Sequence, residues 1–248
     1  MDANVDAREW EGYFSEPVVE GAELPVPAYL QRIYWWTYIH PLALKVFDHQ
    51  WVVNAILLTQ YNHMRTEVLD ELGDLIPGKT LQISCAYGDI TPKLVRRVAA
   101  AGGTLDVVDV LSIQLENAKR KLPAQSPVRL RIMNAEKLDF ASEQYDQVVL
   151  YFLLHEVPDE VRTKTLQEAM RVLKPGGKLV VADFAMPARW NPFRYLWAVF
   201  LTIFEPFALD MWHKEMHEIM PKGGPKFSLT ENRYFGRLFR KAVIRREA

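Results

Sequence analysis

From Lys79 onward the chain alternates short apolar runs with amphipathic segments, and this alternation limits the possible folds more than any other feature. The apolar runs occupy residues 80–85, 105–110, 128–133, 147–154 and 178–183. Short, nearly continuous apolar runs separated by helical patterns are typical of parallel strands that are covered on both faces. Right-handed crossovers then predict an α/β fold with a doubly wound, mostly parallel sheet, whose ligand crevice lies at the carboxyl ends of the strands.

Three other segments flank this pattern. Residues 1–28 are acidic and contain three prolines, so we expect a tail or strap without a helix of its own. Residues 29–73 have helical patterns rich in aromatic side chains and end at Gly73, which predicts an N-terminal helical cap. Residues 184–226 interrupt the strand order before a closing strand or hairpin. Because long insertions are usually functional, we expect a lid on an α/β domain spanning 79–248.

Charge and cysteine content exclude several classes of protein. The formal net charge is −1, which argues against nucleic-acid binding through a basic face. The single cysteine, Cys85, excludes a disulfide framework and a cysteine-based zinc site, and it suits a reducing compartment. No apolar run reaches the roughly 18 residues of a spanning helix, and residues 1–28 resemble neither a signal nor a transit peptide. We therefore expect a cytoplasmic protein.

The first strand and turn, LQISCAYGDITPKL (81–94), suit a nucleotide-type cofactor. In such a strand-turn-helix unit the backbone approaches the ligand closely and helix N–H groups face it. Asp109 ends the second strand, 21 residues after Gly88, and a carboxylate there can accept hydrogen bonds from both hydroxyls of a ribose. The alternative is that Asp109 only caps a helix or forms a turn.

Residues 79–183 resemble class I S-adenosylmethionine-dependent methyltransferases, particularly those that modify quinones. The most specific part is RVLKPGGKLVVAD (171–183), together with the spacing of the strand ends. The resemblance implies S-adenosylmethionine as the cofactor. Besides Asp109, it implies that the cofactor is bound by Val110, Gln114, Asn134, Ala135 and Phe152.

The first turn departs from the pattern of that superfamily, which is an acid followed by three glycines at alternate positions. The same register here gives Gln82, Ser84, Ala86 and Gly88 as the cofactor-binding residues, so the acid and two glycines are missing. An acid at the first position lies near the cofactor ammonium group, and a negative charge there keeps an amine protonated. A neutral Gln82 therefore suits an enzyme that uses the amine as a nucleophile. The alternatives are a neutral replacement, or a charge supplied by Asp89.

A narrower resemblance runs over about residues 25–245, to the rhodoquinone biosynthesis methyltransferase-like family. It rests on YWWTYIHP (34–41), CAYGD (85–89), FLLHE (152–156), EPFALD (205–210) and YFGRLFRKAV (234–243). It implies amino transfer from S-adenosylmethionine to ubiquinone, replacing a ring methoxy group, with a divalent metal, manganese. The alternatives are an ordinary methyltransferase of a quinone precursor and a non-catalytic, cofactor-binding assembly subunit.

Polar residues at the ends of the fourth and fifth strands are candidates for this chemistry. His155, Glu156 and Asp183 offer an imidazole and two carboxylates, which suit a divalent ion that polarises a quinone carbonyl. Alternatively, the His–Glu pair only caps the next helix. Tyr87 and His155, with Gln82, are the candidate catalytic residues. A second candidate metal cluster has the spacing of one helical face and comprises Asp210, His213 and His217.

The chain has seven tryptophans and 12 % aromatic residues, which gather in two segments. Most are expected to be core, but there are too many for one core-facing stripe. The excess predicts an apolar pocket for a quinone, lined by Tyr34, Trp35, Tyr38, His40, Phe207 and Trp212. The same surfaces and the basic C-terminal end predict peripheral binding to the inner face of a membrane. The expected partners are therefore ubiquinone and a membrane surface, with no nucleic acid.

Overall fold

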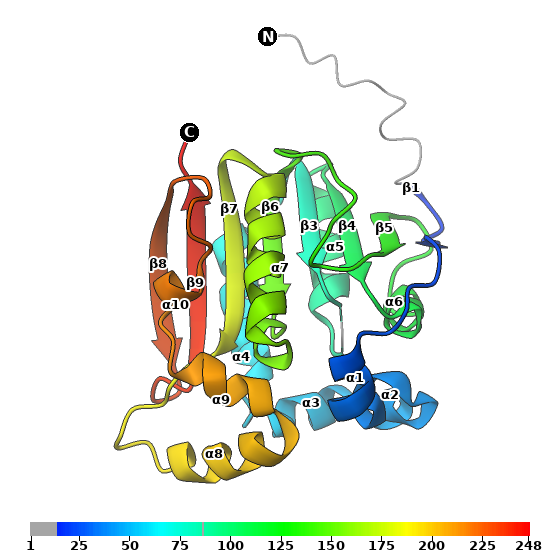
Figure 1. The fold of residues 1–248 in the computed structure, drawn as a ribbon. Coiled ribbons are helices and arrows are strands. Elements are labelled where there is room, and N and C mark those ends of the chain that lie inside the picture. Colours follow the sequence, from blue (N-terminus) through cyan, green and yellow to red (C-terminus); the bar gives the residue numbers. More distant parts are fainter. Residues whose placement is uncertain (1–13, 86) are drawn as a thin grey trace.

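The five predicted apolar runs form the centre of one sheet (Figure 1). A computed structural model describes residues 14–85 and 87–248, and the central strands are β3 (Lys79–Ile83), β4 (Thr104–Asp109), β5 (Ser126–Ile132), β6 (Tyr145–Tyr151) and β7 (Leu173–Phe184). They run parallel in the order β5-β4-β3-β6-β7. The order reverses between β3 and β6, so a ligand crevice is expected where these two strands end. The predicted doubly wound fold is confirmed.

Amphipathic helices cover both faces of this sheet. They are α4 (Tyr61–Leu72), α5 (Ile90–Ala100), α6 (Ser112–Lys119) and α7 (Asp159–Val172). In Figure 1, α7 crosses in front of the central strands and α4 lies behind them. α5 shows the pattern clearly, because Leu94, Val95 and Val98 face the sheet and are buried. α4 ends at Gly73, whose φ of 101° a residue with a Cβ rarely adopts.

The C-terminal residues form a hairpin that extends the sheet. β9 (Phe239–Arg246) pairs antiparallel with β7, and β8 (Phe227–Tyr234) pairs antiparallel with β9. The basic side chains of this hairpin, which the sequence prediction assigns to a membrane surface, also make contacts within the protein. Most of them bond to carboxylates or backbone carbonyls of the protein itself: Arg233, Arg240, Lys241, Arg245 and Arg246.

The N-terminal segment attaches to the opposite edge of the sheet and then forms short helices. β1 (Phe14–Ser15) and β2 (Val19–Glu20) both pair with β5. α1 (Ala28–Ile33), a π-helical turn (Trp35–Ile39), α2 (Pro41–Phe47) and α3 (Gln50–Ile56) follow. The sequence predicts one continuous helix after Pro41, and this is wrong at Asp48. The Asp48 carboxylate accepts hydrogen bonds from Asn117 on α6 and from Lys121 just after it, and this tertiary contact coincides with the break.

The insertion after β7 forms α8 (Phe193–Phe204), α9 (Pro206–Trp212) and α10 (Met216–Ile219). In Figure 1, α8 and α9 lie at the same end of the molecule as α1, α2 and α3. This is the end at which the parallel strands finish. None of the helices in the described ranges has the length and apolar character needed to cross a bilayer. Two segments distant in sequence therefore gather around the expected crevice.

Candidate functional site

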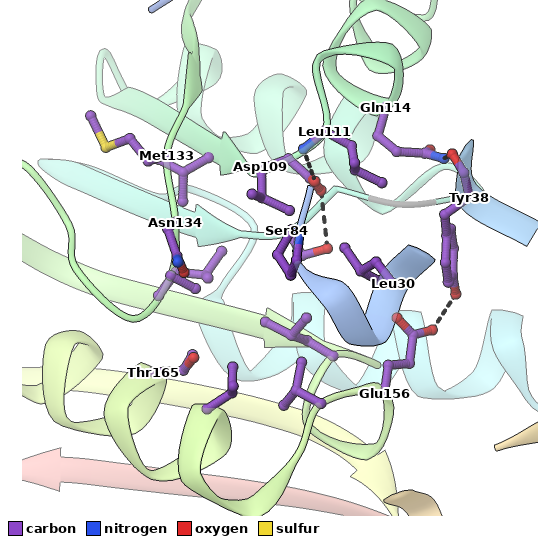
Figure 2. A pocket seen from close by; sticks show the side chains of 18 of the residues that line it. Leu30, Tyr38, Ser84, Asp109, Leu111, Gln114, Met133, Asn134, Glu156 and Thr165 are labelled. Carbon is purple, nitrogen blue, oxygen red and sulfur yellow. Dashed lines mark hydrogen bonds between the residues drawn. The ribbon is translucent and has the colours of Figure 1, made fainter. Parts of the chain in front are cut away.

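Two adjoining cavities lie at the carboxyl ends of β3, β4 and β6, and Figure 2 shows the first. Its walls combine strand ends with residues of α1 and the π-helical turn. They include six of the predicted cofactor-binding residues: Ser84, Asp109, Val110, Gln114, Asn134 and Ala135. Predicted residues from three separate strand ends are thus brought together in one cavity.

Asp109 organises one wall of the first cavity. Its Oδ2 accepts hydrogen bonds from Ser84 Oγ and the Cys85 N–H, both at 3.1 Å, and its Oδ1 accepts one from the Leu111 N–H at 3.0 Å. Burial raises the pKa of Asp109, while the hydrogen bonds from Leu111, Cys85 and Ser84 oppose this shift. A carboxylate offers about four acceptor positions, so Oδ1 keeps capacity for a ligand hydroxyl. Asp109 is therefore both a structural residue and a candidate ribose ligand.

The turn after β3 keeps part of the backbone geometry of a glycine-rich loop without its glycines. Ser84 has a φ of 66°, a conformation that costs a non-glycine residue of the order of 1–3 kcal/mol. Gly88, with a φ of 91°, lines neither cavity, and a Cβ there would meet the Tyr61 hydroxyl at 2.1 Å. The missing side chain of Gly88 therefore leaves room for Tyr61, and its cofactor-binding role stays a prediction. Ala86 lies outside the described residues.

The second cavity is walled mainly by aromatic side chains. They come from the π-helical turn, α2, β6, β7 and α8: Trp36, Phe47, Tyr151, Phe152, Phe184, Trp197, Phe200 and Phe204. Gln82, Tyr87 and His155 also line it. Gln82 is fully buried, its Nε2 donates to the Ser84 carbonyl at 2.9 Å, and its Oε1 has no partner among the described residues. An unpaired buried acceptor facing a cavity suits a ligand donor such as an amine.

A polar cluster lies at one end of the second cavity. His155, Glu156 and Glu205 each offer a ligand atom, and these atoms lie within 4.8 Å of one another. His155 Nδ1 lies 2.8 Å from Asp183 Oδ1, while its Nε2 lies 3.7 Å from Glu156. Burial opposes the charged form of His155, but the neighbouring carboxylates, Asp183 first and then Glu156 and Glu205, outweigh burial and raise its pKa to about 9. Burial raises the pKa values of Glu156 and Glu205.

The structure bears on the predicted roles of Asp183 and Tyr87. Asp183 was expected to ligate a metal, but its carboxylate already accepts hydrogen bonds from the Leu154 and Phe184 N–H groups besides contacting His155. Glu205, from the insertion, completes the group of potential ligands instead. Burial raises the pKa of Tyr87 to about 12, and its hydroxyl donates a hydrogen bond to the Thr37 carbonyl.

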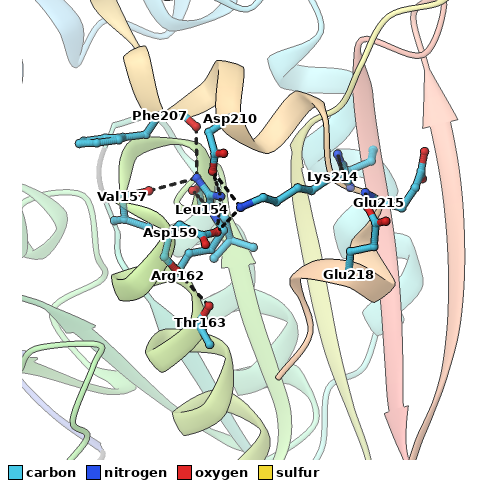
Figure 3. Close-up of polar contacts among 11 residues, drawn as sticks. Leu154, Val157, Asp159, Arg162, Thr163, Phe207, Asp210, Lys214, Glu215 and Glu218 are labelled. Atoms are coloured by element: carbon cyan, nitrogen blue, oxygen red, sulfur yellow. Dashed lines mark hydrogen bonds and ion pairs between the residues drawn. The ribbon is translucent and has the colours of Figure 1, made fainter. Parts of the chain in front are cut away.

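Arg162 fixes the turn that carries His155 and Glu156 against the insertion (Figure 3). Its side chain is fully buried and donates to the carbonyls of Leu154, Val157 and Phe207 at 2.8–3.1 Å. It also pairs with Asp210 at 3.1 Å. One guanidinium thus ties the turn after β6 to α9, directly after Glu205. This explains how residues from two distant segments share one cluster.

The second predicted metal cluster is not formed. Asp210 lies on α9 and pairs with Arg162 and Lys214, whereas His213 ends α9 and His217 belongs to α10. The helix break at His213 separates residues that a continuous helix would align. Asp89, considered as a replacement charge near the cofactor amine, lines neither cavity and pairs with Arg65 at 2.5 Å.

Of the predicted substrate-pocket residues, Tyr38 lines both cavities. The others line neither: Tyr34, Trp35, His40, Phe207 and Trp212. Tyr34 and Trp212 are buried in the core, Trp35 is 52 % exposed, and the His40 ring accepts a hydrogen bond from the Leu42 N–H at the start of α2. The density of aromatics identified the right segments, but the π-helical turn changes which side chains face inward.

Glu205 and several aromatic wall residues were not predicted as site residues. Glu205 begins the EPFALD block, and a carboxylate directly after the apolar helix 193–204 was a usable signal. Trp197, Phe200 and Phe204 lie on α8 and were recognised only as part of an aromatic surface. Phe152, predicted to bind cofactor, lines the second cavity with a φ of 53°.

A doubly wound sheet with these features at its switch point is typical of S-adenosylmethionine-dependent methyltransferases. The features are an acid at the end of β4, a cavity against it and a second cavity under an inserted cover.

The chain belongs to the ubiE/COQ5 methyltransferase family, whose model matches residues 38–227. It is 28 % identical over 189 residues to the demethylmenaquinone methyltransferase of Staphylococcus saprophyticus subsp. saprophyticus, covering 76 % of this chain and 79 % of that protein. The Staphylococcus aureus MRSA252 enzyme of the same name is also 28 % identical over 189 residues, covering 76 % and 77 %.

Solved structures agree on the fold. The cyclase SpnF superposes with a TM-score of 0.57 at 14 % identity, covering 92 % of this chain and 100 % of that chain. The N-methyltransferase NodS of Bradyrhizobium japonicum superposes with a TM-score of 0.51 at 16 % identity, covering 76 % and 99 %. Sequence identities this low support the fold alone. The molecule that accepts the transferred group must be inferred from the site.

Proposed function

We propose that this chain transfers a group from S-adenosylmethionine to the ring of a lipophilic quinone, which it takes from a membrane surface. The observation that carries the proposal is the second cavity, which has an aromatic wall, polar groups at one end and lining residues shared with the first cavity. Apolar pockets with a few convergent polar groups suit ligands of matching shape and polarity. A quinone has ring oxygens at one end and an apolar tail at the other.

S-adenosylmethionine fits the two cavities in a definite direction. The adenosine would lie in the first cavity, with its ribose hydroxyls on Asp109 and its base near Asn134 and Ala135. The amine end would then reach Gln82, whose free Oε1 can accept a hydrogen bond. The cofactor supplies the transferable group, and the chain orients it toward the aromatic cavity.

Methyl transfer to a ring carbon of a quinone precursor is the first candidate reaction. The family and the names of the relatives support it. A reduced quinone must lose a hydroxyl proton as its ring carbon attacks the methyl group. Glu156 and Glu205 lie in the cavity wall, and pKa values raised by burial suit carboxylates that exchange protons near neutral pH.

Amino transfer to ubiquinone is the second candidate, and Gln82 favours it. The position that carries an acid in the superfamily pattern is neutral and fully buried, so no carboxylate at that position holds the cofactor amine in its protonated form. In this reaction the amine adds to the methoxy-bearing ring carbon and methanol leaves. Loss of a proton from the carbon next to the cofactor's α-carbon would then break the bond from nitrogen to the cofactor chain, leaving the aminoquinone and a double bond in that chain. His155, Glu156 and Glu205 would hold a manganese ion that polarises the ring carbonyl.

One labelling experiment tests the proposal and separates the two reactions. The purified chain is incubated with S-adenosylmethionine that carries a deuterated methyl group and nitrogen-15 at its amine. Demethylated quinol and ubiquinone are offered as acceptors in separate reactions. Deuterium in the quinone supports methyl transfer, and nitrogen-15 supports amino transfer. Intact cofactor binding with neither label in either product would overturn the proposal and favour a non-catalytic subunit.

A further inference from the structure

α8 is apolar on its outer face as well as on its inner face. Trp197 and Leu201 are buried against the core. Leu196, Val199 and Ile203 point away from it and are 61 %, 61 % and 65 % exposed. A surface helix ordinarily carries polar residues on its outer side, and a helix that is apolar all round is expected in a buried or membrane environment. Within the described part of the chain, the apolar outer face of α8 is therefore exposed, although its composition is typical of a covered or lipid-facing surface.

A second exposed apolar surface lies on α2 and α3, where Leu42, Val46 and Trp51 are 59 %, 53 % and 72 % exposed. It belongs to the same end of the molecule as α8 (Figure 1). The rings of Trp36 and Phe204, 5.9 Å apart, connect the two segments, and both residues line the second cavity while remaining 37 % and 39 % exposed. The aromatic cavity is therefore continuous with these two outer surfaces.

The charges beside these surfaces have one dominant sign. Residues 28–57 and 187–204 contain four basic side chains, Arg32, Lys45, Arg189 and Arg194, and a single acid, Asp48. Asp48 pairs with Lys121, just after α6, so its charge is already compensated. Exposed apolar side chains bordered by cations match the chemistry of an anionic lipid surface.

We propose that the outer faces of α8 and of α2–α3 bind an anionic lipid bilayer and bring the second cavity to the lipid. This inference rests on the proposed function, because only a lipophilic acceptor needs this route. The exposed aromatic side chains Trp51, Trp190 and Tyr195 then lie at the level of the lipid headgroups, a region that such rings prefer. The apolar side chains of α8 enter the acyl boundary, and the quinone reaches the aromatic wall without crossing water.

Vesicle co-sedimentation of the full chain tests the proposal. The vesicles contain phosphatidylcholine alone or with about a third of phosphatidylglycerol. We expect binding to the anionic vesicles that the double variant L196E/I203E weakens at least tenfold. The matched control is L75E, because Leu75 is also 61 % exposed but precedes β3 at the opposite end of the strands. K45E/R189E should weaken binding to anionic vesicles and leave binding to neutral vesicles unchanged.

The outcomes separate docking from catalysis. L196E/I203E should keep its turnover with a short-tailed, water-soluble quinone and lose it with a long-tailed quinone in vesicles. Absence of vesicle binding by the wild-type chain, or equal losses in L75E and L196E/I203E, would overturn the docking surface. So would a wild-type dimer in solution that the same double variant dissociates, because a second copy would then cover α8. Vesicle binding without modification of any quinone would instead refute the proposed function alone.

Discussion

The Tyr38 hydroxyl donates a hydrogen bond to Glu156 Oε1, and both residues line both cavities. Tyr38 also accepts a hydrogen bond from Gln114 Nε2 at its carbonyl, and its ring stacks on Tyr87 at 5.5 Å. Through the side chain of Tyr38, the π-helical turn thus lines both the first and the second cavity. Under the proposed function, the Tyr38–Glu156 pair forms the boundary across which a group passes from cofactor to acceptor.

Tyr38→Phe should therefore affect turnover more than cofactor binding. The ring and its stacking on Tyr87 are kept, while buried Glu156 loses a donor. Leaving a buried acceptor without its donor costs about 1–3 kcal/mol, so we expect turnover to fall about 5- to 150-fold with the cofactor Kd changed less than about threefold. Steady-state rates and calorimetry measure the two effects. Tyr29→Phe, in the wall of the first cavity, is the control, and an equal loss in both variants would contradict the assigned role.

Asp109→Asn should weaken cofactor binding. The substitution keeps the shape of the side chain but removes the charge that accepts from Ser84, Cys85 and Leu111 and would accept from the ribose. Loss of charged hydrogen bonds of about 1.5–3 kcal/mol corresponds to a Kd about 10- to 150-fold higher. Calorimetry with S-adenosylhomocysteine measures it. Asp106→Asn, on the same strand but outside both cavities, should leave the Kd within about twofold.

The sequence predicts the fold well because its signals are local. Near-continuous apolar strands, amphipathic helices and Gly73 each identify an element without knowledge of the rest of the chain. The N-terminal cap was harder to predict, because the break at Asp48 is associated with contacts to Asn117 on α6 and to Lys121 just after it. Tertiary contacts of this kind leave no periodic pattern in the sequence.

The site was predictable where residues follow strand ends. Asp109 and Asn134 end or follow strands and meet in the first cavity, as the parallel sheet requires. Glu205 was missed because its position depends on the chain reversal between α8 and α9 and on the Arg162 anchor to Phe207 and Asp210. Asp183 was assigned as a metal ligand because its strand end is close to the site, while its hydrogen bonds to backbone N–H groups are visible only in three dimensions.

Gln82→Glu should distinguish the two candidate reactions. If the cofactor amine is the nucleophile, a carboxylate within about 4–6 Å raises the pKa of that amine by about 1–3 units. Each unit lowers the free-amine fraction about tenfold once the amine is mostly protonated. Cofactor binding should then be equal or tighter, while turnover at neutral pH falls by about one to three decades and recovers as pH rises. Tighter binding with undiminished turnover would favour methyl transfer, in which the sulfonium methyl reacts.

Glu205→Gln should weaken manganese binding if the cluster holds a metal. Glu205, Glu156 and His155 offer ligand atoms within 4.8 Å, and removing one carboxylate should raise the Kd for manganese at least tenfold. Electron paramagnetic resonance of added manganese reports this directly, without any turnover. Glu215→Gln, at the exposed start of α10, is the control. Full wild-type activity in excess chelator would refute a metal-dependent reaction and leave methyl transfer as the better proposal.

Asp183→Asn should flatten the dependence of stability on alkaline pH. In the folded protein burial opposes the charged form of His155, but Asp183, with smaller contributions from Glu156 and Glu205, raises its pKa from an ordinary 6.5 to about 9, so the proton is bound more tightly in the folded than in the unfolded state. The resulting stabilisation is fully present below about pH 6.5 and is lost as pH rises through about 9, and it amounts to about 3 kcal/mol at most. The raised pKa of Glu156 acts with the same sign.

Chemical denaturation between these pH values measures the free energy of unfolding. This free energy should fall clearly with rising pH in the wild type and in the exposed control Glu160→Gln, and much less in Asp183→Asn. An unchanged slope in Asp183→Asn would mean that Asp183 does not hold His155 protonated.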